Sequence, residues 1–254
     1  MIDTHAHLTD TRLDAKEILA SMERDGLSRL ITVGYDRASS LGGFKIAQSD
    51  GRVFCTLGFH PSNTDEAGAD EYARFLELSR DPKVVGVGEI GLDYHYPDTD
   101  KPTQLRELLN QLDLVKAADL PVVVHMRDAD ADMFNIIKDN LHKLPKRGVM
   151  HCFSGSLESA LEYIKLGFYI SFSGSVTFKN ARVAPVVAQG IPLERILIET
   201  DCPYLAPEPF RGRLNYPKYV RYVCEKLAEL RGMSAGEMEE ITMRNAYALF
   251  GKLT

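Results

Sequence analysis

The feature that most limits the possible folds of this chain is a regular alternation of short β-branched runs with longer helical patterns. The short runs are rich in valine and isoleucine, as strands are. Eight of them predict strands over residues 2–7, 29–33, 53–58, 84–90, 122–125, 148–152, 168–172 and 195–199. Each strand is followed by a connection that mostly contains a helix, which is typical of parallel strands.

Helical patterns fill these connections and close the chain. They predict helices over residues 14–24, 39–49, 70–79, 103–118, 129–140, 156–166, 181–187, 218–230 and 234–250. A length of 254 residues suits a closed parallel barrel. The main alternative is an open doubly wound sheet, but no glycine-rich phosphate loop follows the first strand. We therefore predict an α/β chain with one domain over residues 1–254, a (β/α)8 TIM barrel with two additional C-terminal helices.

Ionisable side chains gather where the predicted strands end. His5 and His7 share one face of the first strand, because side chains alternate along a strand. The other candidates are Glu89, His125, His151 and Asp201, at or after the fourth, fifth, sixth and eighth strands. Each alone could be a hydrogen-bonded core histidine or a capping carboxylate. The carboxyl ends of barrel strands meet at one pocket, so the six together predict a functional site.

Four imidazoles and two carboxylates are enough to bind two divalent metal cations, and Glu89 is long enough to bridge them. Such a pair activates water for attack on phosphorus or on a carbonyl carbon, which predicts hydrolysis. Asp201 is the natural general base, so we assign Asp201 and Glu89 as catalytic residues. The ligand chemistry favours Zn²⁺ or Mn²⁺, because Mg²⁺ prefers oxygen donors.

Two further polar residues lie near the same strand ends. His60 follows the third strand, where it could donate to a phosphate oxygen or simply shape the turn before Pro61. Arg127 could hold a phosphate in its guanidinium fork, or it could pair with Asp128 or Glu199.

Aromatic rings and a late loop supply the remaining candidates for substrate binding. Tyr94, His95 and Phe153 could stack on a base or serve ordinary packing. Arg211 and Asn215 lie beyond the eighth strand and could contact a substrate backbone, although solvation in a surface loop is the stronger interpretation.

Composition narrows the class of protein. The net charge of −6 argues against an extended duplex-binding surface, which needs clustered lysine and arginine.

The four cysteines form no Cys-x-x-Cys pair, which fits free thiols in a reducing compartment. We expect Cys152 and Cys202 to face the helix layer rather than the site. No leader and no apolar run of ~18 residues is present, so we expect a soluble cytoplasmic protein with no membrane partner and no obligate protein partner.

The combined motifs resemble those of the TatD-type deoxyribonucleases, a branch of the metal-dependent amidohydrolase superfamily. The resemblance covers nearly the whole chain and rests on DTHAHL (3–8), GFHP (58–61), GEIGLDY (88–94), PVVVHMRD (121–128), HCFSG (151–155), GFYIS (167–171) and ETDCPY (199–204). It implies that His5, His7 and Asp201 hold one metal, that His125 and His151 hold the other, and that Glu89 bridges them.

The same resemblance implies a magnesium-dependent 3′–5′ exonuclease that acts on the end of single-stranded DNA, with RNA as a possible substrate. A carbonyl or ester hydrolase with the same centre stays open, such as a D-aminoacyl-tRNA deacylase or a small-amide amidohydrolase, because activated water attacks carbon and phosphorus alike. A non-catalytic scaffold would have lost some of the six ligands, and this chain keeps them all.

Overall fold

The computed structural model describes residues 1–253, and its eight strands form one parallel sheet in sequence order. They are β1 (Ile2–Ala6), β2 (Arg29–Thr32), β3 (Val53–Leu57), β4 (Val84–Asp93), β5 (Val122–Arg127), β6 (Gly148–Met150), β7 (Tyr169–Phe172) and β8 (Ile196–Ile198). The sheet closes where β8 meets β1. There Thr4 Oγ1 donates to the Ile198 carbonyl at 2.9 Å, and the His7 N–H donates to the Cys202 carbonyl at 2.8 Å. The predicted (β/α)8 TIM barrel is confirmed.

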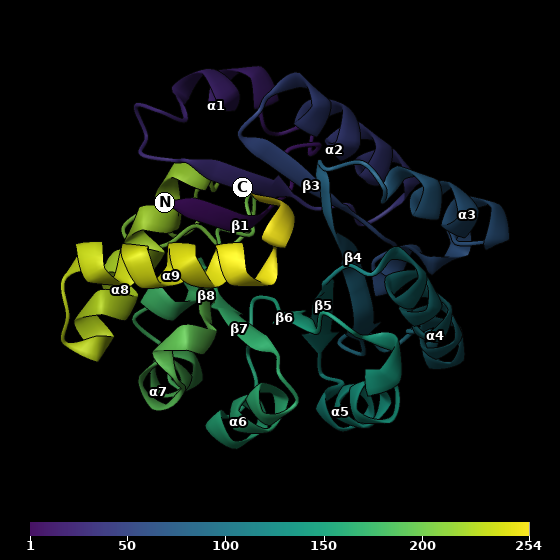
Figure 1. Cartoon of the computed structure of the whole chain (residues 1–254). Helices are drawn as coiled ribbons and strands as arrows, with labels where there is room; N and C mark the ends of the chain where they lie inside the picture. Colours follow the sequence, from purple (N-terminus) through teal and green to yellow (C-terminus); the bar gives the residue numbers. More distant parts are fainter. Residues whose placement is uncertain (254) are drawn as a thin grey trace.

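Helices surround the strands (Figure 1). They are α1 (Ala15–Ser21), α2 (Arg37–Ser49), α3 (Ala69–Leu78), α4 (Lys101–Ala118), α5 (Asp130–Asp139), α6 (Leu157–Lys165), α7 (Val183–Gly190), α8 (Val220–Arg231) and α9 (Ala235–Leu249). Both predicted C-terminal helices form, but only α9 is additional to the barrel, because α8 completes the eighth β/α unit. Within residues 1–253, no helix combines the length and the hydropathy needed to cross a membrane.

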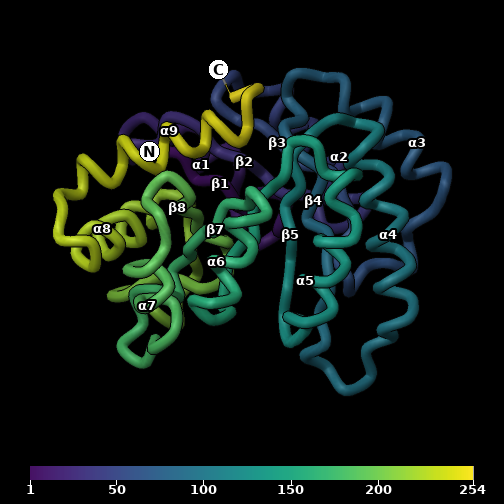
Figure 2. Tube along the Cα trace, turned by 60° about the horizontal axis from the view of Figure 1, so that its bottom comes forward, coloured from purple at the N-terminus to yellow at the C-terminus, as the bar shows by residue number. Residues whose placement is uncertain are grey.

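The end of the chain closes one end of the barrel. Phe250 and Leu253 pack with Val85 and Val123, which point into the barrel near the amino ends of their strands. Lys252 Nζ donates to the carbonyl at the start of β4 at 3.0 Å. Figure 2 shows α9, which is yellow, and the N-terminus, which is purple, at this same end. Only the carboxyl ends of the strands therefore remain open for a site.

Among the strands, the largest difference from the predicted boundaries is in β4, which continues to Asp93 instead of ending at residue 90. Gly91 permits this extension. It pairs with His125 of β5, and a Cβ added to it would lie 1.9 Å from the His125 carbonyl oxygen. Only glycine allows the two strands to approach so closely. Glu89 consequently lies inside β4, and β5 extends as far as Arg127.

Five strands end one or two residues earlier than predicted, and two of these ends bear on the site. β1 ends at Ala6 and β6 at Met150, so that His7 and His151 lie in the segments just after their strands. Helix α7 is also displaced, to Val183–Gly190, because Ala181 still belongs to the preceding turn, where its N–H donates to the Phe178 carbonyl.

Candidate metal centre

The closure of the barrel brings His5, His7 and Asp201 together. Asp201 follows β8, and its N–H donates to the His5 carbonyl at 2.9 Å, which places the end of β8 beside the end of β1. As a result His7 Nε2 lies 3.2 Å from Asp201 Oδ1, and the Nε2 atoms of His5 and His7 are 3.4 Å apart. Three side chains predicted from sequence thus direct their donor atoms to one point.

Glu89 joins this group to a second one. Its Oε1 lies 2.7 Å from His125 Nδ1 and 2.7 Å from His151 Nε2. Its Oε2 faces the other way, 3.4 Å from His5 Nε2 and 3.9 Å from His7 Nε2. One carboxylate oxygen therefore faces each pair of imidazoles.

The surroundings keep both central carboxylates ionised. Burial alone would raise the pKa of Glu89, but the charge on His151 and the hydrogen bonds from the facing imidazoles hold that pKa well below its usual range. Burial also opposes the ionisation of Asp201, yet the hydrogen bond from His7 and the nearby imidazoles keep its pKa below the ordinary value. The centre therefore presents two anionic groups to a cation.

This donor set fits a divalent cation. The potential ligand atoms of His5, His7 and Asp201 all lie within 4.8 Å of one another, and so do those of Glu89, His125 and His151. Imidazole nitrogens mixed with carboxylate oxygens are donors that suit Zn²⁺ and Mn²⁺. The six residues singled out from sequence are thus brought together at the open end of the barrel.

His60 and Arg127 line the same cavity as the centre. His60 Nδ1 accepts a hydrogen bond from the Ser62 N–H at 3.1 Å, so the proton is on Nε2, which lies 3.8 Å from Glu89 Oε1. The guanidinium of Arg127 is not taken up by the pairs that the sequence allowed. Asp128 binds His95 instead, at 2.8 Å.

The other five predicted substrate contacts are not among the residues that line the cavity; they are Tyr94, His95, Phe153, Arg211 and Asn215. The Tyr94 hydroxyl donates to Asp132, and Lys101 lies over its ring. The ring of Phe153 is buried against Tyr163.

The two candidates beyond β8 differ from each other. Arg211 lies over the ring of Phe178 and donates to Asn180 at 3.0 Å. Asn215 is fully buried, so it neither contacts solvent in a surface loop nor reaches the cavity. Its amide donates to the carbonyls of Thr200 and Tyr204.

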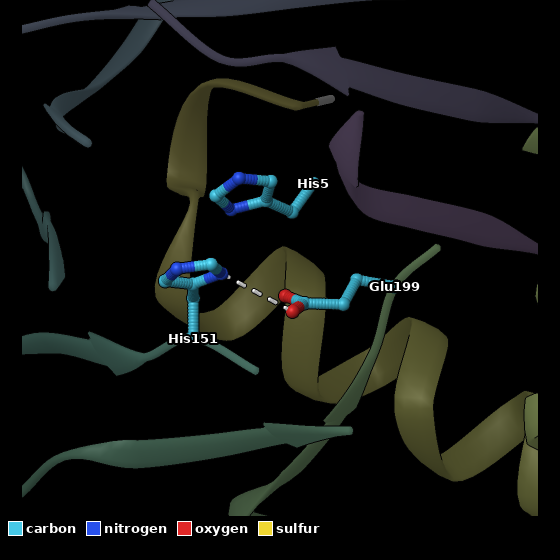
Figure 3. A group of neighbouring side chains, drawn as sticks. All are labelled: His5, His151 and Glu199. Atoms are coloured by element: carbon cyan, nitrogen blue, oxygen red, sulfur yellow. Dashed lines mark hydrogen bonds and ion pairs between the residues drawn. The ribbon is translucent and has the colours of Figure 1, made fainter. Parts of the chain in front are cut away.

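Two carboxylates that the sequence analysis did not assign to the site support its histidines. Glu199 Oε1 lies 3.3 Å from His151 Nδ1, while the His5 ring stacks on His151 with centroids 4.1 Å apart (Figure 3). Asp93 Oδ2 lies 3.3 Å from His125 Nε2. A signal was available for Glu199, which is the last residue of the predicted eighth strand and precedes Asp201 by two residues.

The two cysteines beside ligands behave differently. Cys202 is buried in the hydrophobic core, as predicted. Cys152 has a φ of 43°, which ends the strand alternation, and its Sγ lies 3.1 Å from Ser173 Oγ. Burial, together with the charges on Asp201 and Glu199, raises the pKa of the Cys152 thiol well above its ordinary value. This thiol therefore stays protonated and is a poor nucleophile.

Comparison with known proteins places this centre in a family. The model of the family described as TatD related DNase matches residues 2–251. The chain belongs to this family. Among TatD-related relatives, the "Uncharacterized metal-dependent hydrolase YabD" of Bacillus subtilis is 40% identical over 252 residues, covering 98% of each chain. The "Uncharacterized metal-dependent hydrolase YcfH" of Escherichia coli is 36% identical, covering 98% of this chain and 95% of its own length.

Solved structures agree with this assignment. The TatD homologue YjjV of Escherichia coli has a TM-score of 0.93 and 31% identity, covering 99% of this chain and 98% of that one. A TatD-family hydrolase of Entamoeba histolytica has a TM-score of 0.88 and 25% identity, covering 98% and 97%. Together with the histidine and carboxylate ligands of the candidate metal centre, these similarities identify this protein as a metal-dependent hydrolase.

Proposed function

We propose that the chain is a two-metal 3′–5′ exonuclease that removes nucleotides from the end of single-stranded DNA, with single-stranded RNA as an alternative substrate. The observation that carries the proposal is the orientation of Glu89, whose two carboxylate oxygens face different pairs of imidazoles. A carboxylate in this position suits a bridge between two cations. The name of the family, TatD related DNase, supports a nucleic-acid substrate.

In this proposal each residue has a defined role. His5, His7 and Asp201 would hold one cation, His125 and His151 the other, and Glu89 both. Two bound divalent cations would supply positive charge for an anionic substrate and lower the pKa of a water.

Asp201 is the best placed general base. Its side chain is 14% exposed, against 4% for Glu89 and 5% for Asp93, so it is the carboxylate of the cavity most accessible to water. It is also ionised, and it can therefore accept a proton.

The cavity favours a strand end over a duplex. Its volume of about 460 Å³ is on the scale of a small ligand. Arg127 lies in its wall and can hold a phosphate in two hydrogen bonds. The Nε2–H of His60 is a second donor for a phosphate oxygen. Three carboxylates share the cavity, so binding of a phosphodiester depends on cations to offset their repulsion.

The substitution Asp201→Asn tests the assigned base. The amide cannot accept the proton, so we expect hydrolysis of labelled single-stranded DNA to fall by roughly 10²–10⁴-fold while the circular dichroism spectrum stays unchanged. Asp98→Asn, on an exposed loop at the same end of the barrel, should retain full activity. A variant that degrades the strand at the parental rate would show that Asp201 is not the base.

The substitution Glu89→Gln tests the bridge. We expect metal content, measured by elemental analysis after dialysis against metal, to fall from two ions per chain toward one. Glu194→Gln, an exposed matched change, should keep two. An occupancy of two in Glu89→Gln would count against the bridging role.

Product analysis separates the nuclease from a carbonyl hydrolase. The wild type should release mononucleotides from a strand labelled at its 5′ end, with the label remaining on progressively shorter fragments. Release of amino acid from a D-aminoacyl-tRNA, with the oligonucleotides left intact, would favour a deacylase instead. Release of amine from a small amide would favour an amidohydrolase.

A further inference from the structure

Two tyrosines stand exposed at the rim of the catalytic cavity. Tyr96 is 55% exposed and Tyr204 is 50% exposed, and both line the cavity that contains Glu89 and Asp201. The burial of an aromatic ring is favourable, so a ligand in this cavity would gain affinity by covering either ring. Neither residue belongs to the metal ligands.

The topology places the two rings on opposite sides of the cavity. Tyr96 lies in the loop between β4 and α4, whereas Tyr204 lies in the loop after β8. The strands follow one another around the barrel in sequence order, so β4 and β8 are four positions apart and face each other across it. The metal centre lies between them. A ligand held at the centre therefore has one aromatic ring on either side.

Each tyrosine has an arginine against its ring. The Arg12 guanidinium lies 4.6 Å from the Tyr204 ring centroid, and Asp10 fixes it there with contacts of 2.9 and 2.7 Å. Arg127 lies 5.8 Å from the Tyr96 centroid. Aromatic rings combined with guanidinium groups hold unpaired nucleobases with little sequence preference, since every base has a π-face.

We infer that Tyr96 and Tyr204 stack the two nucleobases on either side of the scissile phosphate. The two nucleosides joined by a phosphodiester extend from the phosphorus in opposite directions. With that phosphate at the centre, one base meets each wall. This inference rests on the proposed nuclease function and adds a base-binding site to it. It also predicts that the chain needs unstacked bases, which a single strand offers and a duplex does not.

Missing-base substrates test the inference directly. Three labelled single strands of one sequence are compared: intact, without the 3′-terminal base, and without the penultimate base. On the intact strand we expect Tyr96→Ala and Tyr204→Ala each to raise KM roughly 5- to 100-fold, with a smaller effect on kcat. Each variant should lose this penalty on one missing-base strand, and the two variants should lose it on different strands.

The controls separate the ring from other roles. Tyr→Phe and Tyr→Trp at either position should stay within about twofold of the wild-type KM, because stacking needs the ring and not the hydroxyl. Tyr169→Ala should leave KM unchanged. Tyr169 also has an arginine against its ring, Arg195 at 5.0 Å, but it lies at the start of β7, far from the open end.

The outcomes distinguish this inference from the function on which it rests. If the wild type cleaves the intact strand and both alanine variants keep its KM, or carry the same penalty on all three strands, the stacking inference alone is overturned. If the wild type releases no nucleotide, the proposed nuclease function fails and the base-binding site fails with it.

Discussion

At the scale of single residues, the two histidines beside Glu89 Oε1 are better supported than the other pair. Glu199 lies behind the outer nitrogen of His151, and Asp93 lies behind that of His125. A carboxylate in this position fixes the tautomer that leaves the inner nitrogen free, and it strengthens that nitrogen as a ligand.

His5 and His7 have no such support. Their Nδ1 atoms are buried and have no hydrogen-bond partner within residues 1–253. The two imidazole pairs are therefore unequal, and we expect Glu199 and Asp93 to strengthen the binding of the cation held by His125 and His151.

Glu199→Gln tests this difference. The amide keeps the size of the side chain but removes the charge behind His151, so we expect the affinity for the cation held by His125 and His151 to fall by roughly 10–100-fold. Calorimetric titration of the metal-free protein with Mn²⁺ measures it. Glu194→Gln is the matched control and should leave both binding steps unchanged. Equal weakening of both steps would contradict the assignment of Glu199 to a single pair.

The six metal-ligand candidates could be predicted from sequence because their residue types are distinctive and the barrel places strand ends together. Asp93 could not be predicted in the same way. Two glycines interrupt the apolar pattern after Val87, and glycine ordinarily weakens a strand. Here Gly91 instead allows close pairing with β5, and the strand continues to Asp93.

At the scale of elements, the segment after β8 has to hold both Asp201 and Tyr204. The buried side chain of Asn215 holds this segment in place through hydrogen bonds to its backbone. Its Nδ2 donates to the Thr200 carbonyl at 2.8 Å and to the Tyr204 carbonyl at 2.6 Å, and its Oδ1 accepts from the Tyr216 N–H at 2.9 Å. One buried amide thereby joins the end of the last strand to the start of the segment that leads into α8.

Asn215→Ala should therefore destabilise the protein. Removal of the amide leaves buried carbonyls without donors, which costs about 1–3 kcal/mol, and we expect activity to fall as the position of Asp201 loosens. Chemical denaturation followed by circular dichroism gives the free energy of unfolding. Asn180→Ala, at an exposed asparagine whose side chain accepts a hydrogen bond from Arg211, should change it by less than about 0.5 kcal/mol. Unchanged stability with a raised KM would instead support the substrate contact predicted from sequence.

Loops were the part of the chain that sequence reasoning described least well. The strands are set by runs of β-branched residues, and seven of the eight end within two residues of the prediction. Tyr96, Tyr204 and Asn215 lie in connections with no periodic pattern, where side-chain direction depends on tertiary contacts. The sequence accordingly offered no means of separating exposed rings from buried ones.

At the scale of the whole molecule, the centre joins distant parts of the barrel. Its ligands come from or follow β1, β4, β5, β6 and β8, so a bound cation connects segments across the barrel. The unfolded chain cannot present these ligands together. Metal binding should therefore stabilise the folded state by mass action, which amounts to about 2.7 kcal/mol when the free metal is at 100 times its dissociation constant.

Removal of metal should consequently lower the melting temperature. For a chain of this size, about 2.7 kcal/mol corresponds to a decrease of roughly 5–10 °C on chelation, and re-addition of the native metal should reverse it. Scanning calorimetry with Mg²⁺, Mn²⁺ and Zn²⁺ added singly would rank the metals by the concentration that restores the transition. The imidazole-rich ligands predict restoration at lower Zn²⁺ or Mn²⁺ than Mg²⁺, even if Mg²⁺ supports turnover. In Glu89→Gln, re-addition of metal should restore only part of the melting temperature, because this variant lacks the carboxylate that faces both imidazole pairs. A melting temperature indifferent to chelator and to every metal would mean that these six side chains form a polar core and bind no cation.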